Sequence, residues 1–121
     1  MNAPSPTVAL LGTGRMGLPM ARRLCQAGLQ VHVWNRNRAR AEPLTADGAQ
    51  VHDSPDAAVR EADLVISMLE NGPVVEAVLF TQGVAQAMRP GTLVVDMASI
   101  KPTEARDHAQ RLEALGLLHV D

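Results

Sequence analysis

Three closely spaced glycines are the residues whose spacing most directly suggests chemistry. Gly12-Thr13-Gly14-Arg15-Met16-Gly17 has the pattern G-x-G-x-x-G, follows the short apolar run Val8–Leu11 and opens a stretch with helical spacing of apolar residues. In this context the first glycine permits a tight turn, the second lets the backbone approach a pyrophosphate, and the third lets the helix pack closely on the strand. The six residues are therefore candidate dinucleotide contacts, with the anion on free N–H groups at the helix start. The alternative, a turn that binds nothing, needs only one glycine.

Basic residues follow the second apolar run, at the place where a dinucleotide-binding domain often carries an acid. An Asp or Glu about 20 residues past the glycines would accept a hydrogen bond from a ribose 2′-OH. Asn35 and Arg36 stand there instead. A guanidinium can hold a 2′-phosphate with two parallel bonds, whereas a carboxylate would repel it. The sequence therefore favours NADP(H) over NAD(H), with Arg36 as a phosphate ligand, while Arg38 or Arg40 taken individually is expected to be solvated.

The elements that must position these residues alternate between strand and helix. Pro19 is expected in the first turn of the first helix, where its missing N–H is harmless, and Ser54 is expected to cap a helix that begins at Pro55. Alternating strands and helices predict an α/β fold, a Rossmann-type doubly wound parallel sheet of about six strands with flanking helices. Residues 1–121 are interpreted as one dinucleotide-binding domain. The expected strands cover 8–11, 30–34, 49–52, 64–69, 92–97 and 117–120. The first expected helix ends at Gly28, and later helices are expected over 38–46, 74–80, 84–88 and 103–115.

Composition excludes several classes of function. The chain of 121 residues is 46% hydrophobic and 20% charged with a net charge of −2, which gives no electrostatic reason to expect nucleic acid or an acidic membrane as a partner. Its aromatic residues are only Trp34 and Phe80, so base stacking is disfavoured. No run approaches the roughly 18 apolar residues of a membrane span. The lone Cys25 and the absence of a targeting signal at the N-terminus favour a cytoplasmic protein.

The segment from Leu10 to Ala21 closely resembles the N-terminal signature of the β-hydroxyacid dehydrogenases, which include 3-hydroxyisobutyrate dehydrogenase and, more distantly, 6-phosphogluconate dehydrogenase. Residues 33–36 resemble the NADP-type second strand, and residues 62–69 and 95–102 resemble the fourth and fifth strands with the substrate loop. The resemblance runs from about Val8 to Asp121. It implies reversible hydride transfer between a nicotinamide cofactor and a small-molecule substrate, a β-hydroxy acid or semialdehyde.

The same resemblance implies roles for further residues. Leu69, Glu70 and Val74 would lie against the cofactor, although Glu70 stands where the family usually has proline. Ser99 would reach toward the nicotinamide end of the cofactor and the substrate carboxylate; its alternative role is an ordinary cap ahead of Pro102.

The chain is expected to supply no catalytic residue. The resemblance implies a lysine as proton donor, on a helix beyond Asp121, so Lys101, the sole lysine, is interpreted as a solvated loop residue. It also implies that the chain stops before a C-terminal all-helical domain. An exposed apolar surface near the last strand and a homodimer or higher homo-oligomer are then expected.

No metal site is predicted, because the four histidines are scattered without ligand spacing. Two alternatives to the dehydrogenase remain open. The domain could serve as a non-catalytic NAD(P)-sensing module, or it could belong to an imine reductase or another relative of 6-phosphogluconate dehydrogenase.

Overall fold

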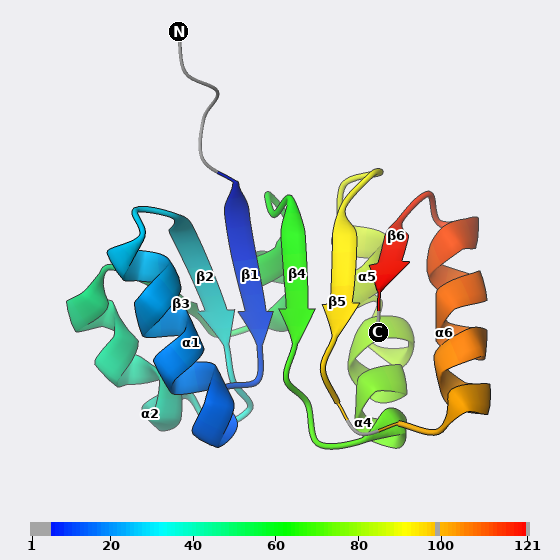
Figure 1. Ribbon diagram of the computed structural model, residues 1–121, viewed down its shortest axis with the longest axis horizontal. Coiled ribbons are helices and arrows are strands. Elements are labelled where there is room, and N and C mark those ends of the chain that lie inside the picture. The colour runs from blue at the N-terminus through cyan, green and yellow to red at the C-terminus, as the bar shows by residue number, and fades with distance from the viewer. Residues whose placement is uncertain (1–5, 99, 121) are drawn as a thin grey trace, which may run out of the picture.

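Six parallel strands form one sheet in the part of the chain that the computed structural model describes, residues 6–98 and 100–120 (Figure 1). The strand order is β3-β2-β1-β4-β5-β6, so the chain builds the sheet outward from β1 in one direction, returns, and continues from β4 in the other. The predicted doubly wound α/β fold is confirmed. The strands are β1 (Thr7–Leu11), β2 (Gln30–Trp34), β3 (Gln50–His52), β4 (Leu64–Ser67), β5 (Leu93–Asp96) and β6 (Leu118–Val120).

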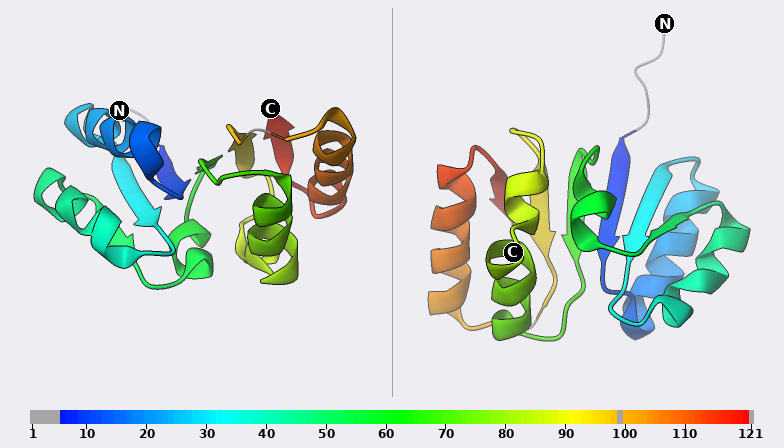
Figure 2. Two further views of the ribbon diagram at one scale, coloured as in Figure 1. Left: turned by 90° about the horizontal axis from the view of Figure 1, so that it is seen from below. Right: turned by 180° about the vertical axis from the view of Figure 1, so that it is seen from behind.

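Helices cover both faces of the sheet, and each face has its own apolar core (Figure 2). Side chains alternate along a strand, so Val8 and Leu10 of β1 pack with α1 and its neighbours, while Ala9 and Leu11 pack with the helices of the other face. The first face carries α1 (Gly14–Gln26), α2 (Arg38–Ala41) and the 3₁₀ helix η1 (Glu42–Asp47). The second carries α3 (Pro55–Val59), α4 (Gly72–Glu76), the π-helix η2 (Ala77–Thr81), α5 (Val84–Ala87) and α6 (Pro102–Ala114).

The helices differ from the prediction at three prolines. Pro19 is the sixth residue of α1 rather than a first-turn residue, so α1 continues to Gln26 without the bond that an N–H at this position would donate. Pro43 enters the helix predicted over 38–46, which is instead one α-helical turn followed by η1. Pro73 lies in the first turn of α4, where no N–H is needed; Gly72-Pro73 therefore starts this helix instead of separating it from β4.

Two smaller expectations were also wrong. Helix α3 begins at Pro55 as predicted, but the Ser54 side chain makes no capping hydrogen bond. Strand β4 ends at Ser67 rather than at Leu69, because the chain leaves the sheet after the Met68 N–H donates to the Leu11 carbonyl, 2.8 Å away. The residues after Met68 are thereby released from the sheet and become loop.

The far edge of the sheet exposes apolar side chains, as predicted. Leu118 and Val120 of β6 are 59% and 50% exposed, and Met97, just after β5, is 50% exposed. Over the described residues, no helix combines the length and the apolar character that crossing a membrane requires.

Two histidines that are distant in the sequence meet on neighbouring strands. His32 Nδ1 on β2 lies 2.8 Å from His52 Nε2 on β3, and the rings stack with their centroids 5.0 Å apart. The expectation that all histidines are scattered was therefore wrong for this pair. Burial lowers the pKa of His52, and the positive charges of His32 and Arg38 lower it further against an opposing effect of Asp53. A single N–H···N bond satisfies both rings only while at least one of them is neutral.

The pair predicts a pH-dependent stability. Because the folded-state pKa of His52 is below its ordinary value of 6.5, the unfolded chain takes up this proton more readily, and stability falls as the pH drops through and below 6.5. We expect His52→Gln to show a smaller loss of melting temperature between pH 8 and pH 5.5 than the wild type, as followed by circular dichroism. His119→Gln serves as the control for removing a histidine elsewhere. Equal slopes for the wild type and His52→Gln would contradict the prediction.

Candidate functional site

A cleft opens where the two halves of the sheet diverge, at the carboxyl ends of β1, β2 and β4. Strand β1 pairs with β2 on one side and with β4 on the other. The loop after β1 leads to α1 on one face of the sheet and the loop after β4 leads to α4 on the other face, so these two loops diverge and leave a crevice between them. The cleft has a volume of about 1030 Å³. Its described lining residues are Gly12, Thr13, Trp34, Asn35, Arg36, Asn37, Arg40, Met68, Leu69, Glu70, Pro73, Val74, Ala77, Val78 and Gln82.

Two residues of the glycine loop, Gly12 and Thr13, line this cleft. Gly12 has φ +83°, a left-handed conformation that favours glycine, and its N–H donates to the Trp34 carbonyl at 2.8 Å. A Cβ on Gly12 would lie 3.1 Å from the Met68 carbonyl oxygen, and one on Gly17 would lie 3.2 Å from the Gly12 carbonyl oxygen. The tight turn and the close packing predicted for these two glycines are both present.

Helix α1 starts at this loop with its first turn uncapped by the preceding side chain. Thr13 occupies the position before the helix and makes no side-chain capping bond. N–H groups in a first helical turn have no partner within the helix, and the positive end of the helix dipole adds to their attraction for an anion. The start of α1 therefore has the donors that a phosphate requires.

Most of the residues predicted to bind cofactor meet in the cleft. Those among its lining residues are Gly12, Thr13, Asn35, Arg36, Leu69, Glu70 and Val74. Met16, 66% exposed, and the buried Gly17 belong to α1 but are not among the lining residues. The surroundings of Gly14, the side chain of Arg15 and the whole of Ser99 lie outside the part of the chain that the structure describes.

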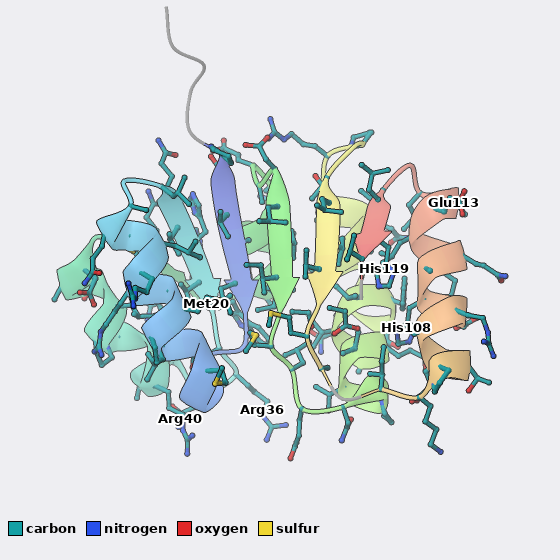
Figure 3. The ribbon with its side chains drawn as sticks, viewed as in Figure 1. Met20, Arg36, Arg40, His108, Glu113 and His119 are labelled. Carbon is teal, nitrogen blue, oxygen red and sulfur yellow. The ribbon has the colours of Figure 1, made fainter. Side chains whose placement is uncertain are left out.

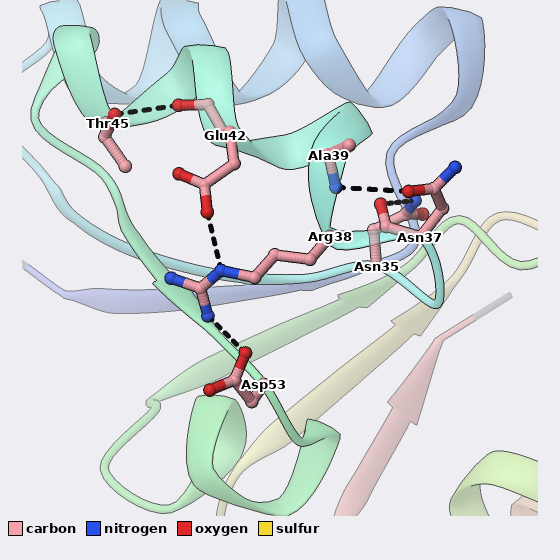
Figure 4. Close-up of polar contacts among 7 residues, drawn as sticks. All are labelled: Asn35, Asn37, Arg38, Ala39, Glu42, Thr45 and Asp53. Carbon is pink, nitrogen blue, oxygen red and sulfur yellow. Dashed lines mark hydrogen bonds and ion pairs between the residues drawn. The ribbon is translucent and has the colours of Figure 1, made fainter.

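The three arginines that follow β2 divide into two groups. Arg38 Nε bonds to Glu42 Oε1 and its Nη1 to Asp53 Oδ1, both at 2.6 Å, and these hydrogen bonds raise its pKa (Figure 4). Arg36 and Arg40 instead line the cleft, and neither forms a side-chain ion pair with a described residue (Figure 3). Among the described residues that line the cleft, the positive charge available to a ligand therefore comes from Arg36 and Arg40.

Arg40 is the functional candidate that the sequence reasoning missed. The sequence does contain an indication. Glu42 lies four residues after Arg38, and an Arg and a Glu at this helical spacing form an ion pair on the helix surface. That pairing removes Arg38 from the set of available ligands and leaves Arg40 in it.

Asparagine side chains connect the glycine loop after β1 to the loop after β2. Asn35 Oδ1 accepts from the Thr13 N–H at 3.2 Å, and Asn35 Nδ2 donates to the Asn37 carbonyl at 2.7 Å. Asn37 Oδ1 in turn accepts from the Ala39 N–H at 3.1 Å and caps α2 (Figure 4). The side chain of Asn35 is thus engaged at both ends with protein backbone.

A second cleft of about 650 Å³ lies beyond the ends of β4 and β5. Asn71, Glu104 and the exposed Lys101 are among its lining residues, and the Lys101 N–H donates to Glu104 Oε1 at 3.0 Å. Asp96 is buried at the end of β5, and its Oδ1 accepts from the Ala98 N–H at 3.0 Å. The Asp96 side chain therefore caps the turn that follows β5.

Three potential metal ligands, which the sequence reasoning did not group, meet between α4 and α6. Glu76, Asp107 and the buried His108 bring ligand atoms within 4.8 Å of one another. Arg111 Nη1 lies 2.7 Å from Glu76 Oε1 and 3.3 Å from Asp107 Oδ2, and its guanidinium stacks on Phe80. The guanidinium therefore already supplies the positive charge that these carboxylates attract.

Comparison with known proteins agrees with the fold. Residues 7–121 match the family described as the NAD binding domain of 6-phosphogluconate dehydrogenase. The chain is 35% identical over 115 residues to 3-sulfolactaldehyde reductase of Escherichia coli (strain K12), which covers 94% of this chain and 39% of that protein.

Solved structures are similar over the same region. A structure of 3-hydroxyisobutyrate dehydrogenase from Mycobacterium tuberculosis with L-serine superposes with a TM-score of 0.89 at 38% identity, covering 96% of this chain and 39% of that one. An imine reductase from Myxococcus stipitatus in complex with NADP⁺ gives a TM-score of 0.87 at 29% identity, covering 94% of this chain and 39% of that one.

The chain thus spans about two fifths of the length of these relatives. The match over residues 7–121 includes the glycine loop and every residue assigned above to the two clefts. The resemblance to 3-hydroxyisobutyrate dehydrogenase is therefore confirmed. The chain belongs to the family of the NAD binding domain of 6-phosphogluconate dehydrogenase.

Proposed function

We propose that this chain is the cofactor-binding part of an oxidoreductase and that it prefers NADP(H) to NAD(H). The observation that carries the preference is that Arg36 and Arg40 both line the cleft beside the glycine loop and that neither forms an ion pair with a described residue. A 2′-phosphate on the adenosine ribose would meet two guanidinium groups there and no carboxylate from the same loop. The pyrophosphate would lie on the N–H groups at the start of α1.

The reaction proposed for the whole protein is reversible hydride transfer between the nicotinamide ring and a small β-hydroxy acid or semialdehyde. The nicotinamide supplies the hydride chemistry, and this chain's residues bind and orient it. In this proposal Leu69 and Val74 pack on the cofactor, and Glu70 lies beside it at the cleft wall. Ser99 lies in the sequence between Ala98 and Ile100, which both line the second cleft, and in this proposal it contacts the substrate carboxylate, while proton transfer is assigned to a residue outside this chain.

A second candidate is the cofactor domain of an imine reductase. The similarity to the NADP⁺-bound imine reductase favours it, because that enzyme shares this fold at 29% identity. Both candidates use the same cofactor cleft, and they differ in what enters the second cleft. Reduction of a semialdehyde by the complete protein, with no turnover of a cyclic imine, would support the first candidate over the second.

Removal of single arginines tests the cofactor preference. We expect Arg36→Ala to weaken NADPH binding by about 10- to 100-fold, the effect of losing charge-assisted hydrogen bonds. NADH, which lacks the 2′-phosphate, should lose less than about threefold, and Arg40→Ala should show the same selectivity with a smaller loss. Trp34 is the only tryptophan and lines the cleft, so its emission reports both titrations.

Arg38→Ala is the matched control, since it removes the same charge from the same segment but from a side chain paired with Glu42 and Asp53. It should change neither affinity by more than about twofold. Equal affinities of the wild type for NADPH and NADH, or a loss for Arg38→Ala as large as that for Arg36→Ala, would refute the assignment.

We also propose that the protein forms a homodimer or higher homo-oligomer through the sheet edge at β6. Leu118 and Val120 are exposed there on an edge strand whose outer backbone groups are available for pairing. Light scattering after size exclusion is expected to give at least twice the monomer mass. Leu118→Lys should shift the protein toward the monomer, whereas Leu115→Lys, on the exposed end of α6, should not. A monomeric wild type at concentrations of about 100 µM would count against the proposal.

A further inference from the structure

Helix α1 lacks the acceptor that commonly holds the N–H of the residue before a helix. In a capping box, the side chain at the third helical position, Glu or Gln, accepts from that N–H. The third position of α1 is Met16, which cannot accept in this way. Asn35, 22 residues away on the loop after β2, provides the acceptor instead, with Oδ1 at 3.2 Å from the Thr13 nitrogen.

The other end of the same amide holds the arginine loop. Asn35 Nδ2 donates to the Asn37 carbonyl at 2.7 Å, so the backbone on both sides of Arg36 is fixed by one side chain. The arrangement requires an acceptor facing Thr13 and a donor facing Asn37, and a carboxamide supplies the two from separate atoms of one short side chain. Backbone also joins the two loops, because the Gly12 N–H donates to the Trp34 carbonyl just before Asn35.

We propose that Asn35 is a positioning residue that locks the glycine loop and the Arg36 loop into one geometry, acting through backbone contacts rather than by binding cofactor itself. This inference rests on the proposed function for its effect on NADPH. With Asn35 in place, the Arg36 side chain starts from a fixed backbone at a fixed distance from the start of α1. Binding of the 2′-phosphate then loses less conformational freedom than it would with a free loop.

The first test measures the lock itself in the ligand-free protein. Hydrogen exchange of the Thr13 amide, followed by NMR, should accelerate by about tenfold in Asn35→Ala, since the amide loses its acceptor. Asn35→Asp retains an acceptor for Thr13 and should keep the slow exchange. Gln110→Ala removes an exposed amide from α6, far from the cleft, and should behave as wild type. Unchanged Thr13 exchange in Asn35→Ala would overturn the inference.

The second test separates positioning from a general structural effect. Asn35→Ala should weaken NADPH by about tenfold and NADH by about threefold, the scale of one or two hydrogen bonds. In an Arg36→Ala background, Asn35→Ala should weaken the binding of both nucleotides equally, by about threefold. The larger loss for NADPH in the single variant acts through Arg36, so it should disappear when Arg36 is absent. Asn35→Asp should weaken the binding of NADPH more than that of NADH, because its carboxylate cannot donate to the Asn37 carbonyl and stands beside Arg36.

The outcomes distinguish the two proposals. Equal losses of NADPH and NADH affinity on Asn35→Ala, with the same losses in the Arg36→Ala background, would overturn the positioning role. A wild-type protein that binds neither nucleotide would overturn the proposed function, while Thr13 exchange would still decide whether Asn35 locks the loops.

Discussion

The close approach of three backbone segments at Gly12 is the constraint on which the cleft depends. The Gly12 N–H bonds to the end of β2, the Met68 N–H bonds to the Leu11 carbonyl, and the Met68 carbonyl lies where a side chain on residue 12 would stand. This contact is possible only at the turn out of the central strand, where the sheet's two halves separate. It brings together the loops after β1, β2 and β4, which carry most of the candidate cofactor ligands.

The same constraint explains why the sequence predicted the fold well. Apolar runs mark the strands, and the glycine spacing fixes the turn after β1, so the order of elements and the location of the cleft both follow from local patterns. Helix boundaries were harder to predict, because the effect of a proline depends on its position in a helix, and that position depends on where the helix starts. Pro73 illustrates this point, since the Asn71 cap moves the helix start ahead of it.

Contacts between side chains that are distant in the sequence were not predictable from such patterns. The Asn35–Thr13 bond joins residues from two turns, and the His32–His52 pair depends on the register of β2 against β3. A sequence read one segment at a time contains neither relation. The difference in pairing between Arg38 and the other two arginines was partly predictable. One partner of Arg38, Glu42, lies at helical spacing, while the other, Asp53, lies beyond β3.

Charge in the cleft is determined by this pairing rather than by composition. The chain as a whole is slightly acidic, with a net charge of −2, yet one wall of the cleft carries Arg36 and Arg40. Glu70, on the loop after β4, contributes the opposite charge to the lining. Because short-range charge interactions outweigh a small net charge screened by salt, this uneven distribution of charge over the lining, rather than the net charge of the chain, is what a charged ligand would meet in the cleft.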